Sequence, residues 1–190
     1  ADTYYLRGLS KASLDDYNGA IADYNKAIEL DPNNAYAYYF RGYSKGFLED
    51  YSGAMADFTK AIELDPDYVY SYYSRGDLKH NSEDYNGAIA DYTKAIELDP
   101  NSIYAYYSRG LSKVILEDFN GAIADFTKAI ELDPNDADNY YLRGLSKFES
   151  EDYSGAMVDY SKAIELDPYS AGAYVDRGVA KELLGDMNGA

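Results

Sequence analysis

The spacing of the prolines is the feature that most limits what this chain can fold into. All five prolines lie 34 residues apart, and each one ends a nearly identical segment, of which GAIADYNKAIELDP at 19–32 is the first copy. Twelve of the fifteen glycines keep the same register, at positions 8 and 19 of the period. The prolines are Pro32, Pro66, Pro100, Pro134 and Pro168. A strict internal period of this length is typical of a repeat protein, in which each repeat packs mainly against its neighbours.

The chain of 190 residues divides into five full repeats and the beginning of a sixth. We number them repeats 1 to 6 and give each residue a position from 1 to 34 within its repeat. The full repeats cover 1–34, 35–68, 69–102, 103–136 and 137–170, and the partial repeat covers 171–190. We therefore expect one repeat array over residues 1–190. We also expect this array to be a fragment of a longer protein, because the last repeat stops in mid-pattern.

Each repeat is predicted to form two helices, at about positions 2 to 14 and 17 to 30. The Asp-Pro pair that follows ends the second helix, because proline disfavours helical geometry in the residue before it and lacks the N–H of the next hydrogen bond. Aspartate at position 16 is a good N-cap for the second helix. Position 34 can cap the first helix of the next repeat, and the capping residues there are Asn34, Ser102, Asp136 and Ser170.

Small residues recur at positions 8, 20 and 27, an aromatic residue recurs at position 24, and proline recurs at position 32. In this pattern the chain resembles the tetratricopeptide repeat family over essentially its whole length. The resemblance implies an all-α fold, a right-handed α-solenoid or superhelix built from antiparallel helix pairs. Three positions depart from the family pattern: tyrosine replaces tryptophan at position 4, arginine replaces an apolar residue at position 7, and lysine replaces an aromatic residue at position 11.

The overall charge and composition exclude several classes of function. A formal net charge of −17 makes nucleic acid and anionic membranes unfavourable partners, because both are bound through basic surfaces. The chain has no cysteine, and no apolar run approaches the roughly 18 residues of a membrane span. No nucleophile, oxyanion or phosphate-loop motif is visible, so we expect neither enzymatic activity nor a cofactor. The sequence does not fix the compartment, although the cytoplasm is slightly favoured.

All 17 basic residues occupy three positions of the repeat, namely 7, 11 and 26. We interpret this periodic charge as a solvated outer surface with local ion pairs, in preference to a charged binding face. The arginine at position 7 and the aspartate at position 23 recur together. We therefore predict that they pair across the two helices of each repeat, as Arg75 and Asp91 would in repeat 3.

The family resemblance implies that the first helices line a concave groove through positions 2, 5, 9, 12 and 13. These positions share one helical face by their spacing. Here they carry many tyrosines with apolar neighbours, and a large exposed aromatic surface usually marks a binding site. The alternative for the position-5 tyrosines is packing between repeats. The predicted groove residues are Tyr36, Tyr39, Tyr43, Tyr70, Tyr73, Tyr104, Tyr107, Leu111, Asp138 and Tyr141.

The stretch DLKHN at 77–81 interrupts this apolar surface, since every other full repeat has leucine or tyrosine at position 9. Asp77, His80 and Asn81 are spaced i, i+3 and i+4, so they share one helical face. We interpret them as a polar anchor that fixes the register of a bound peptide. The alternatives are drift at a tolerant position, a small-molecule or zinc site, and an acid–base dyad. One histidine with one aspartate is weak evidence for zinc.

We therefore predict a protein–protein interaction scaffold that binds a peptide or partner protein in a tyrosine-rich concave groove. Family members that bind chaperone C-termini clamp a carboxylate with basic groove residues, and the corresponding positions are not basic here. An apolar, aromatic, proline-rich or modestly basic partner segment fits better. The alternative is a structural spacer or a self-associating solenoid within a larger protein, with self-association through the uncovered C-terminal helix.

Overall fold

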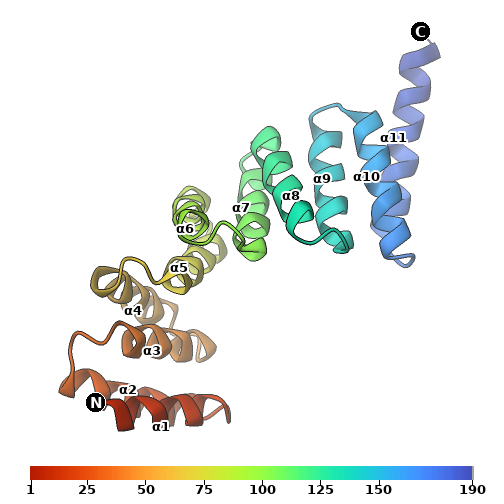
Figure 1. Ribbon diagram of the computed structural model, residues 1–190. Coiled ribbons are helices and arrows are strands. Elements are labelled where there is room, and N and C mark those ends of the chain that lie inside the picture. Colours follow the sequence, from red (N-terminus) through yellow and green to blue (C-terminus); the bar gives the residue numbers. More distant parts are fainter. Residues whose placement is uncertain (190) are drawn as a thin grey trace. The chain divides into compact units, whose positions relative to one another are not determined.

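The computed structural model describes residues 1–189, and the side chains of residues 1–185. All regular secondary structure in this range is helical, in eleven helices (Figure 1). They are α1 (Asp2–Ala12), α2 (Tyr17–Leu30), α3 (Ala35–Phe47), α4 (Tyr51–Leu64), α5 (Val69–Asn81), α6 (Tyr85–Leu98), α7 (Ile103–Ile115), α8 (Phe119–Leu132), α9 (Ala137–Glu149), α10 (Tyr153–Leu166) and α11 (Ala171–Gly189). No described helix combines the length and the apolar composition that crossing a membrane requires.

Each full repeat forms a helical hairpin. The second helix runs from position 17 to position 30 in all five full repeats, as predicted. In repeats 2 to 5 the first helix runs from position 1 to position 13, one residue earlier than predicted. The prediction of an all-α solenoid of antiparallel helix pairs is confirmed.

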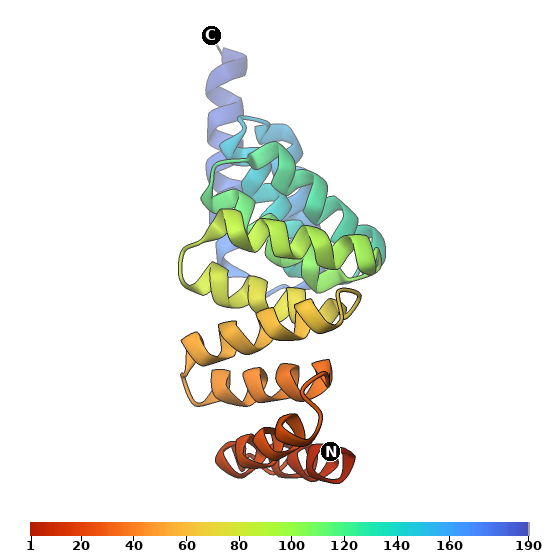
Figure 2. The same ribbon diagram turned by 90° about the vertical axis from the view of Figure 1, so that its left-hand side faces the viewer.

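The helices form two compact units, Ala1–Asp99 and Pro100–Ala190, which we call the N-terminal unit and the C-terminal unit. Within the N-terminal unit each helix from α1 to α6 packs against the next one in the chain. Figure 2 shows these helices stacked in chain order. Within the C-terminal unit α7 to α11 follow the same rule. The prediction of a single array over residues 1–190 stays a prediction.

The connection between the two helices of a repeat is short because one residue adopts a left-handed backbone. In repeat 2 this residue is Glu49, with φ of 62°. The amides of Glu49 and Asp50 donate to the carbonyls of Gly46 and Lys45 at 3.0 and 2.9 Å, which is a Schellman motif. Asp50 then caps α4, because its carboxylate accepts from the amide of Gly53 at 3.0 Å. A Cβ on Gly53 would lie 2.1 Å from Asp50 Oδ2, which explains the glycine at position 19.

Small residues at positions 8, 20 and 27 let the helices approach around a buried ring at position 24. In repeat 3 a Cβ on Gly76 would lie 2.8 Å from the ring of Tyr92, so only glycine fits there without displacement. Ala88 and Ala95 are fully buried beside it. Burial of one such ring contributes roughly 1.5–3 kcal/mol, and the arrangement recurs in every full repeat.

The predicted N-caps at position 34 are confirmed at two residues and wrong at a third. Asn34 Oδ1 accepts from the amide of Ala37 at 3.0 Å, and Asp136 Oδ1 accepts from the amide of Asp138 at 2.9 Å. The side chain of Ser102 makes no capping hydrogen bond, although its backbone, with φ of −73° and ψ of 91°, has the geometry of a cap. At the start of α7, Ser102 therefore has the backbone conformation of an N-cap residue without the side-chain hydrogen bond.

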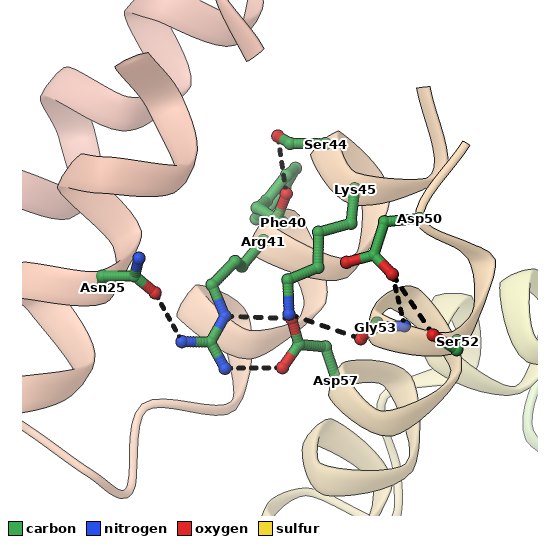
Figure 3. Close-up of polar contacts among 9 residues, drawn as sticks. All are labelled: Asn25, Phe40, Arg41, Ser44, Lys45, Asp50, Ser52, Gly53 and Asp57. Atoms are coloured by element: carbon green, nitrogen blue, oxygen red, sulfur yellow. Dashed lines mark hydrogen bonds and ion pairs between the residues drawn. The ribbon is translucent and has the colours of Figure 1, made fainter. Parts of the chain in front are cut away.

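The predicted ion pair between positions 7 and 23 is confirmed in all five full repeats. In repeat 2, Arg41 Nε and Nη2 donate to the two carboxylate oxygens of Asp57 at 2.9 and 2.6 Å (Figure 3). Lys45 Nζ lies 2.8 Å from the same carboxylate, which is buried. Arg41 Nη1 also donates to Asn25 Oδ1 in α2 at 2.7 Å. One arginine therefore joins the two helices of its own repeat to the preceding repeat.

The interpretation of the charged positions as a solvated outer surface is wrong for positions 7 and 11. In repeats 2 to 5 these arginine and lysine side chains are only 16–22% exposed, because both converge on a buried carboxylate between two helices. The interpretation is confirmed for position 26. There each lysine forms an exposed ion pair with the glutamate three residues further along.

Candidate functional site

Exposed aromatic rings gather along α3 and at the start of α5, within the N-terminal unit. Tyr36 and Tyr70, both at position 2, are 46% and 59% exposed. Tyr43 and Phe47, at positions 9 and 13, are 44% and 53% exposed. Helical spacing puts Tyr36, Tyr43 and Phe47 on the same side of α3. The two helices therefore present apolar side chains that the packing of the hairpins leaves uncovered.

Tyr68 holds several of these rings together. It lies between α4 and α5, and its ring centroid is 4.9 Å from that of Tyr36, 5.0 Å from that of Tyr39 and 5.6 Å from that of Tyr70. All three contacts are edge-to-face, and each such contact contributes about 0.5–1.5 kcal/mol beyond the burial of area. Burial among these rings raises the pKa of Tyr68. The exposed rings therefore have a fixed support.

The tyrosines at position 5 pack with their rings inside the hairpins, against the position-24 rings of their own repeats. The alternative expected from the sequence, packing between repeats, applies to the hydroxyls of Tyr39 and Tyr141, which contact Ser74 and Asp176 in the next repeat. Tyr39 is 8% exposed, so it supports the exposed rings from below and offers little contact area to a partner. Tyr73, Tyr107 and Tyr141 are half-buried, with ring centroids 5.9, 6.3 and 5.9 Å from the position-24 rings of their own repeats. The exposed part of the predicted tyrosine ladder therefore lies at positions 2 and 9.

Two pockets adjoin along this face and share Tyr43. The first, which we call the tyrosine pocket, has a volume of about 350 Å³ and is lined by Tyr39, Phe40, Tyr43, Tyr68 and Tyr70. The second, which we call the Asp77 pocket, has a volume of about 330 Å³. Its aromatic walls include Tyr43, Phe47 and Tyr51, and its polar lining consists of Ser74, Asp77 and Asn81. The exposed rings and the two pockets together are called the aromatic groove below.

Asp77 has a partner inside its own hairpin. The hydroxyl of Tyr92 donates to Asp77 Oδ1 at 2.7 Å, from α6 to α5. Burial raises the pKa of the Asp77 carboxyl, while the hydrogen bond from Tyr92, the charge of His80 and a hydrogen bond from Tyr73 act in the opposite direction. A partly buried carboxylate in such surroundings gains from any further donor or cation that reaches it.

Repeats 1 and 5 show what the hairpin lacks without this aspartate. Both carry leucine at position 9, namely Leu9 and Leu145, and both carry tyrosine at position 24. The hydroxyls of these two tyrosines, Tyr24 and Tyr160, are buried and have no hydrogen-bond partner in the described residues. The departure from the repeat pattern at Asp77 therefore has a structural consequence, because it supplies an acceptor for a buried hydroxyl.

The three residues predicted as a polar anchor do not all converge. Asp77 and Asn81 line the Asp77 pocket, and Asn81 is exposed. The ring of His80 is half-buried and packs edge-on against that of Tyr85, at 5.3 Å between centroids. In the part of the chain that the structure describes, no group of three or more His, Cys, Asp or Glu residues is placed to hold a metal ion.

The remaining predicted residues belong to the C-terminal unit. Tyr104, at position 2, is 74% exposed, and Asp138 at the same position is exposed as well. Leu111 is half-buried. The hydroxyl of Tyr141 donates to Asp176 Oδ2 in α11 at 2.9 Å, so this tyrosine joins α9 to α11. Tyr104 therefore offers the largest exposed aromatic surface among these four residues.

Several residues of the aromatic groove are absent from the predicted set, and two of them had a signal in the sequence. Tyr68 takes position 34, where the other full repeats have Asn, Ser or Asp, and its departure from that capping pattern was an available signal. Gly46, at position 12, lines the Asp77 pocket, and a Cβ added there would meet nothing within 4 Å. The other full repeats have alanine, histidine, valine and phenylalanine at this position, so the glycine was a second signal.

Solved structures with the same fold extend over almost the whole chain. YrrB, described as a tetratricopeptide repeat protein with an unusual peptide-binding site, superposes with a TM-score of 0.84 at 27% identity, over 92% of this chain and 90% of its own. A MamA protein superposes with a TM-score of 0.82 at 26% identity, over 90% and 93%. MamA from Desulfovibrio magneticus RS-1 gives 0.81 at 21% identity, over 90% and 96%. Comparison with curated protein sequences gave no match.

The sequence profiles of one repeat family match most of the chain. The profile described as tetratricopeptide repeat matches residues 1–34 and 103–136. A second profile, described as TPR repeat, matches residues 48–82, 76–114 and 144–185. The hairpins, their register and these matches agree, and the chain belongs to the tetratricopeptide repeat family.

Proposed function

We propose that this chain binds an extended segment of a partner protein in the aromatic groove of its N-terminal unit. The tetratricopeptide fold serves in general as a scaffold for protein interaction. One observation carries the proposal beyond the family: Tyr36 and Tyr70 are about half exposed, at a position where packing does not require an aromatic residue. Repeats 1 and 5 fold with aspartate there, at Asp2 and Asp138.

The chemistry of these rings suits recognition. Tyrosine offers a large rigid contact area with few rotatable bonds and a polar tip, so it loses little conformational entropy when a ligand covers it. Contiguous exposed apolar surface is a feature of interaction sites. The contacts of Tyr68 with Tyr36 and Tyr70 also fix both rings before any partner arrives, which reduces the entropy lost on binding.

The shape of the groove favours a segment that is extended along the helices. The tyrosine pocket and the Asp77 pocket meet at Tyr43, so neighbouring side chains of one segment could occupy both. The structural similarity to YrrB, whose description includes a peptide-binding site, supports a peptide as the ligand. A C-terminal carboxylate is a poor ligand for this groove, because no basic residue among the described side chains lines either pocket.

Peptide display tests the proposal. The full chain would be used to select peptides from a random library, and the enriched peptides would be titrated against wild type and a Tyr36→Ala/Tyr70→Ala variant. We expect the variant to bind at least about tenfold more weakly, because both exposed rings are lost. Tyr169→Ala is the matched control, since Tyr169 is 92% exposed and lies between α10 and α11. Equal affinity for wild type and the double variant, or no enriched peptide, would remove the proposal.

A second function, self-association of the solenoid, is favoured by a separate observation in the C-terminal unit. Val158 on α10 and Val175 and Val179 on α11 are 68%, 64% and 42% exposed. Sedimentation equilibrium of wild type and of a Val158→Lys/Val175→Lys variant tests this function. Association that rises with concentration and disappears in the lysine variant supports it, whereas a wild-type monomer at all concentrations excludes it.

A further inference from the structure

The Asp77 pocket differs in chemistry from the rest of the aromatic groove. The tyrosine pocket is lined by aromatic residues alone. The Asp77 pocket combines aromatic walls with one carboxylate, and no lysine, arginine or histidine among the described residues lines it. A negative charge at the wall of a largely apolar pocket is unfavourable unless something pairs with it.

The charge of Asp77 is not cancelled by the lysines of the neighbouring helices. Lys45 on α3 lies 2.8 Å from the carboxylate of Asp57, and Lys79 on α5 lies 2.8 Å from that of Asp91. Both lysines therefore serve the ion pairs between the helices. The hydroxyls of Tyr92 and Tyr73 donate to Asp77, but neutral donors leave the negative charge in place. The charge of His80 also acts on this carboxyl, but His80 does not line the pocket.

The aromatic walls suit a cation as well as its apolar stem. The faces of Tyr and Phe rings attract an ammonium or guanidinium group, and this attraction grows when water is excluded. The methylene groups of lysine and arginine pack readily against such rings while the charged head reaches a polar partner. Tyr43, Phe47 and Tyr51 supply the rings, and Asp77, with the amide of Asn81, supplies the polar end.

The pocket is open because of Gly46. A Cβ at this residue would point into space that holds no atom within 4 Å. Repeat 4 carries Val114 and repeat 5 carries Phe148 at the same position, and both repeats form the same hairpin. The opening is therefore a feature of repeat 2 that the fold does not require.

We propose that the Asp77 pocket receives an arginine or lysine side chain of the bound segment, with the cation against Asp77 and the stem between the aromatic walls. This inference rests on the proposed function of the aromatic groove and narrows its ligand to a segment with one basic residue at a fixed place. The formal net charge of −17 favours the approach of such a segment.

The experiment uses peptides selected on the full chain and two substitutions that keep the fold. Asp77→Asn removes the charge and retains an oxygen that can accept from Tyr92. Gly46→Val fills the opening with the side chain that repeat 4 has there, and it replaces glycine in a helix by a residue with higher helix propensity. Gly178→Val in α11 is the matched control, because a Cβ at Gly178 also meets nothing within 4 Å and lies outside the groove.

Titration calorimetry compares each selected peptide with a version whose basic residue is neutral, citrulline for arginine or acetyllysine for lysine. We expect a basic residue at one constant place, a loss of about tenfold or more in affinity on neutralising it, and the same loss with Asp77→Asn and with Gly46→Val. Neutralising the peptide should then have less than about a twofold effect on Asp77→Asn. Gly178→Val should bind like wild type.

The outcomes separate this inference from the proposed function. Peptides that depend on Tyr36 and Tyr70 but carry no constant basic residue, or tolerate its neutralisation, overturn the inference and leave the proposed function intact. Peptides that bind Gly46→Val as well as they bind wild type overturn it too. A selection that enriches nothing overturns both.

Discussion

The hydrogen bond between Tyr92 and Asp77 allows a test in which the chain supplies its own controls. Repeat 4 has leucine and phenylalanine at the two corresponding positions, namely Leu111 and Phe126, and it forms the same hairpin. The double variant Asp77→Leu/Tyr92→Phe therefore converts repeat 3 to a combination that the fold already accepts. The two single variants each remove one side of a 2.7 Å hydrogen bond.

The expected magnitudes follow from which group loses its partner. Tyr92→Phe takes one donor from a partly buried carboxylate, and a hydrogen bond to a charged group contributes about 1.5–3 kcal/mol. Asp77→Leu takes the acceptor from a buried hydroxyl, at a cost of about 1–3 kcal/mol that is partly offset by burial of the leucine. The double variant has neither group. We therefore expect it to be within about 0.5 kcal/mol of wild type or more stable, with a coupling energy of at least about 1.5 kcal/mol.

The assay is urea denaturation of wild type and the three variants, monitored by circular dichroism. The slope of the unfolding free energy against urea concentration should be the same in all four proteins, which checks that unfolding stays cooperative. Tyr24→Phe is the control, because the hydroxyl of Tyr24 is buried without a hydrogen-bond partner in the described residues. Its removal should leave the free energy of unfolding unchanged or raise it. A coupling energy near zero, or a loss from Tyr24→Phe as large as that from Tyr92→Phe, would refute the reasoning.

Three further predictions concern the scaffold. Glu83→Gly should raise the free energy of unfolding by about 0.5–1 kcal/mol in urea denaturation, because the φ of 65° at Glu83 suits glycine better than a residue with a Cβ; a loss of stability would contradict this reading. Asp91→Ala should lower the free energy of unfolding by about 3–5 kcal/mol, since it leaves Arg75 and Lys79 without their buried carboxylate. Glu97→Ala breaks an exposed ion pair and should lower it by less than about 1 kcal/mol. Equal losses for the two variants in urea denaturation would contradict the role of burial. Arg7 and Lys11 lower the pKa of Asp23 to about 2, below the roughly 3.9 of an unfolded chain, so the stability from this carboxylate is present above pH ~4 and lost as the pH falls towards ~2. Asp23→Asn should reduce the loss of stability between these pH values, and an unchanged pH profile would exclude the effect.

Features that recur in every repeat could be predicted from the sequence. The helix boundaries follow from the Asp at position 16 and the Asp-Pro at positions 31 and 32, because caps and prolines act locally. The pairing of Arg75 with Asp91 followed from joint recurrence, since two charges kept at a fixed offset in five copies are explained by contact. Recurrence did not reveal that these charges are half-buried, because burial depends on how the second helix of the preceding repeat covers them.

Features that belong to one repeat were harder to predict. The partner of Asp77 could not be deduced from helical spacing, because Tyr92 lies on a different helix and tyrosine at position 24 also occurs opposite leucine. The split of the tyrosine ladder into the buried Tyr39 and the exposed Tyr36 depends on the angle between packed helices. Tyr68 belongs to the aromatic groove through ring contacts with Tyr36 of its own repeat and with Tyr70 of the next repeat.

Chemical-shift mapping of a selected peptide on the full chain, labelled with ¹⁵N, tests the central claim most directly. The account predicts that the amide shifts change most along α3 and the start of α5, around Tyr36, Gly46 and Tyr70, and that Tyr36→Ala/Tyr70→Ala abolishes these changes. The same changes should survive Tyr169→Ala. Shift changes confined to α10 and α11, or spread over the chain without a maximum at α3 and α5, would contradict the aromatic groove as the binding site.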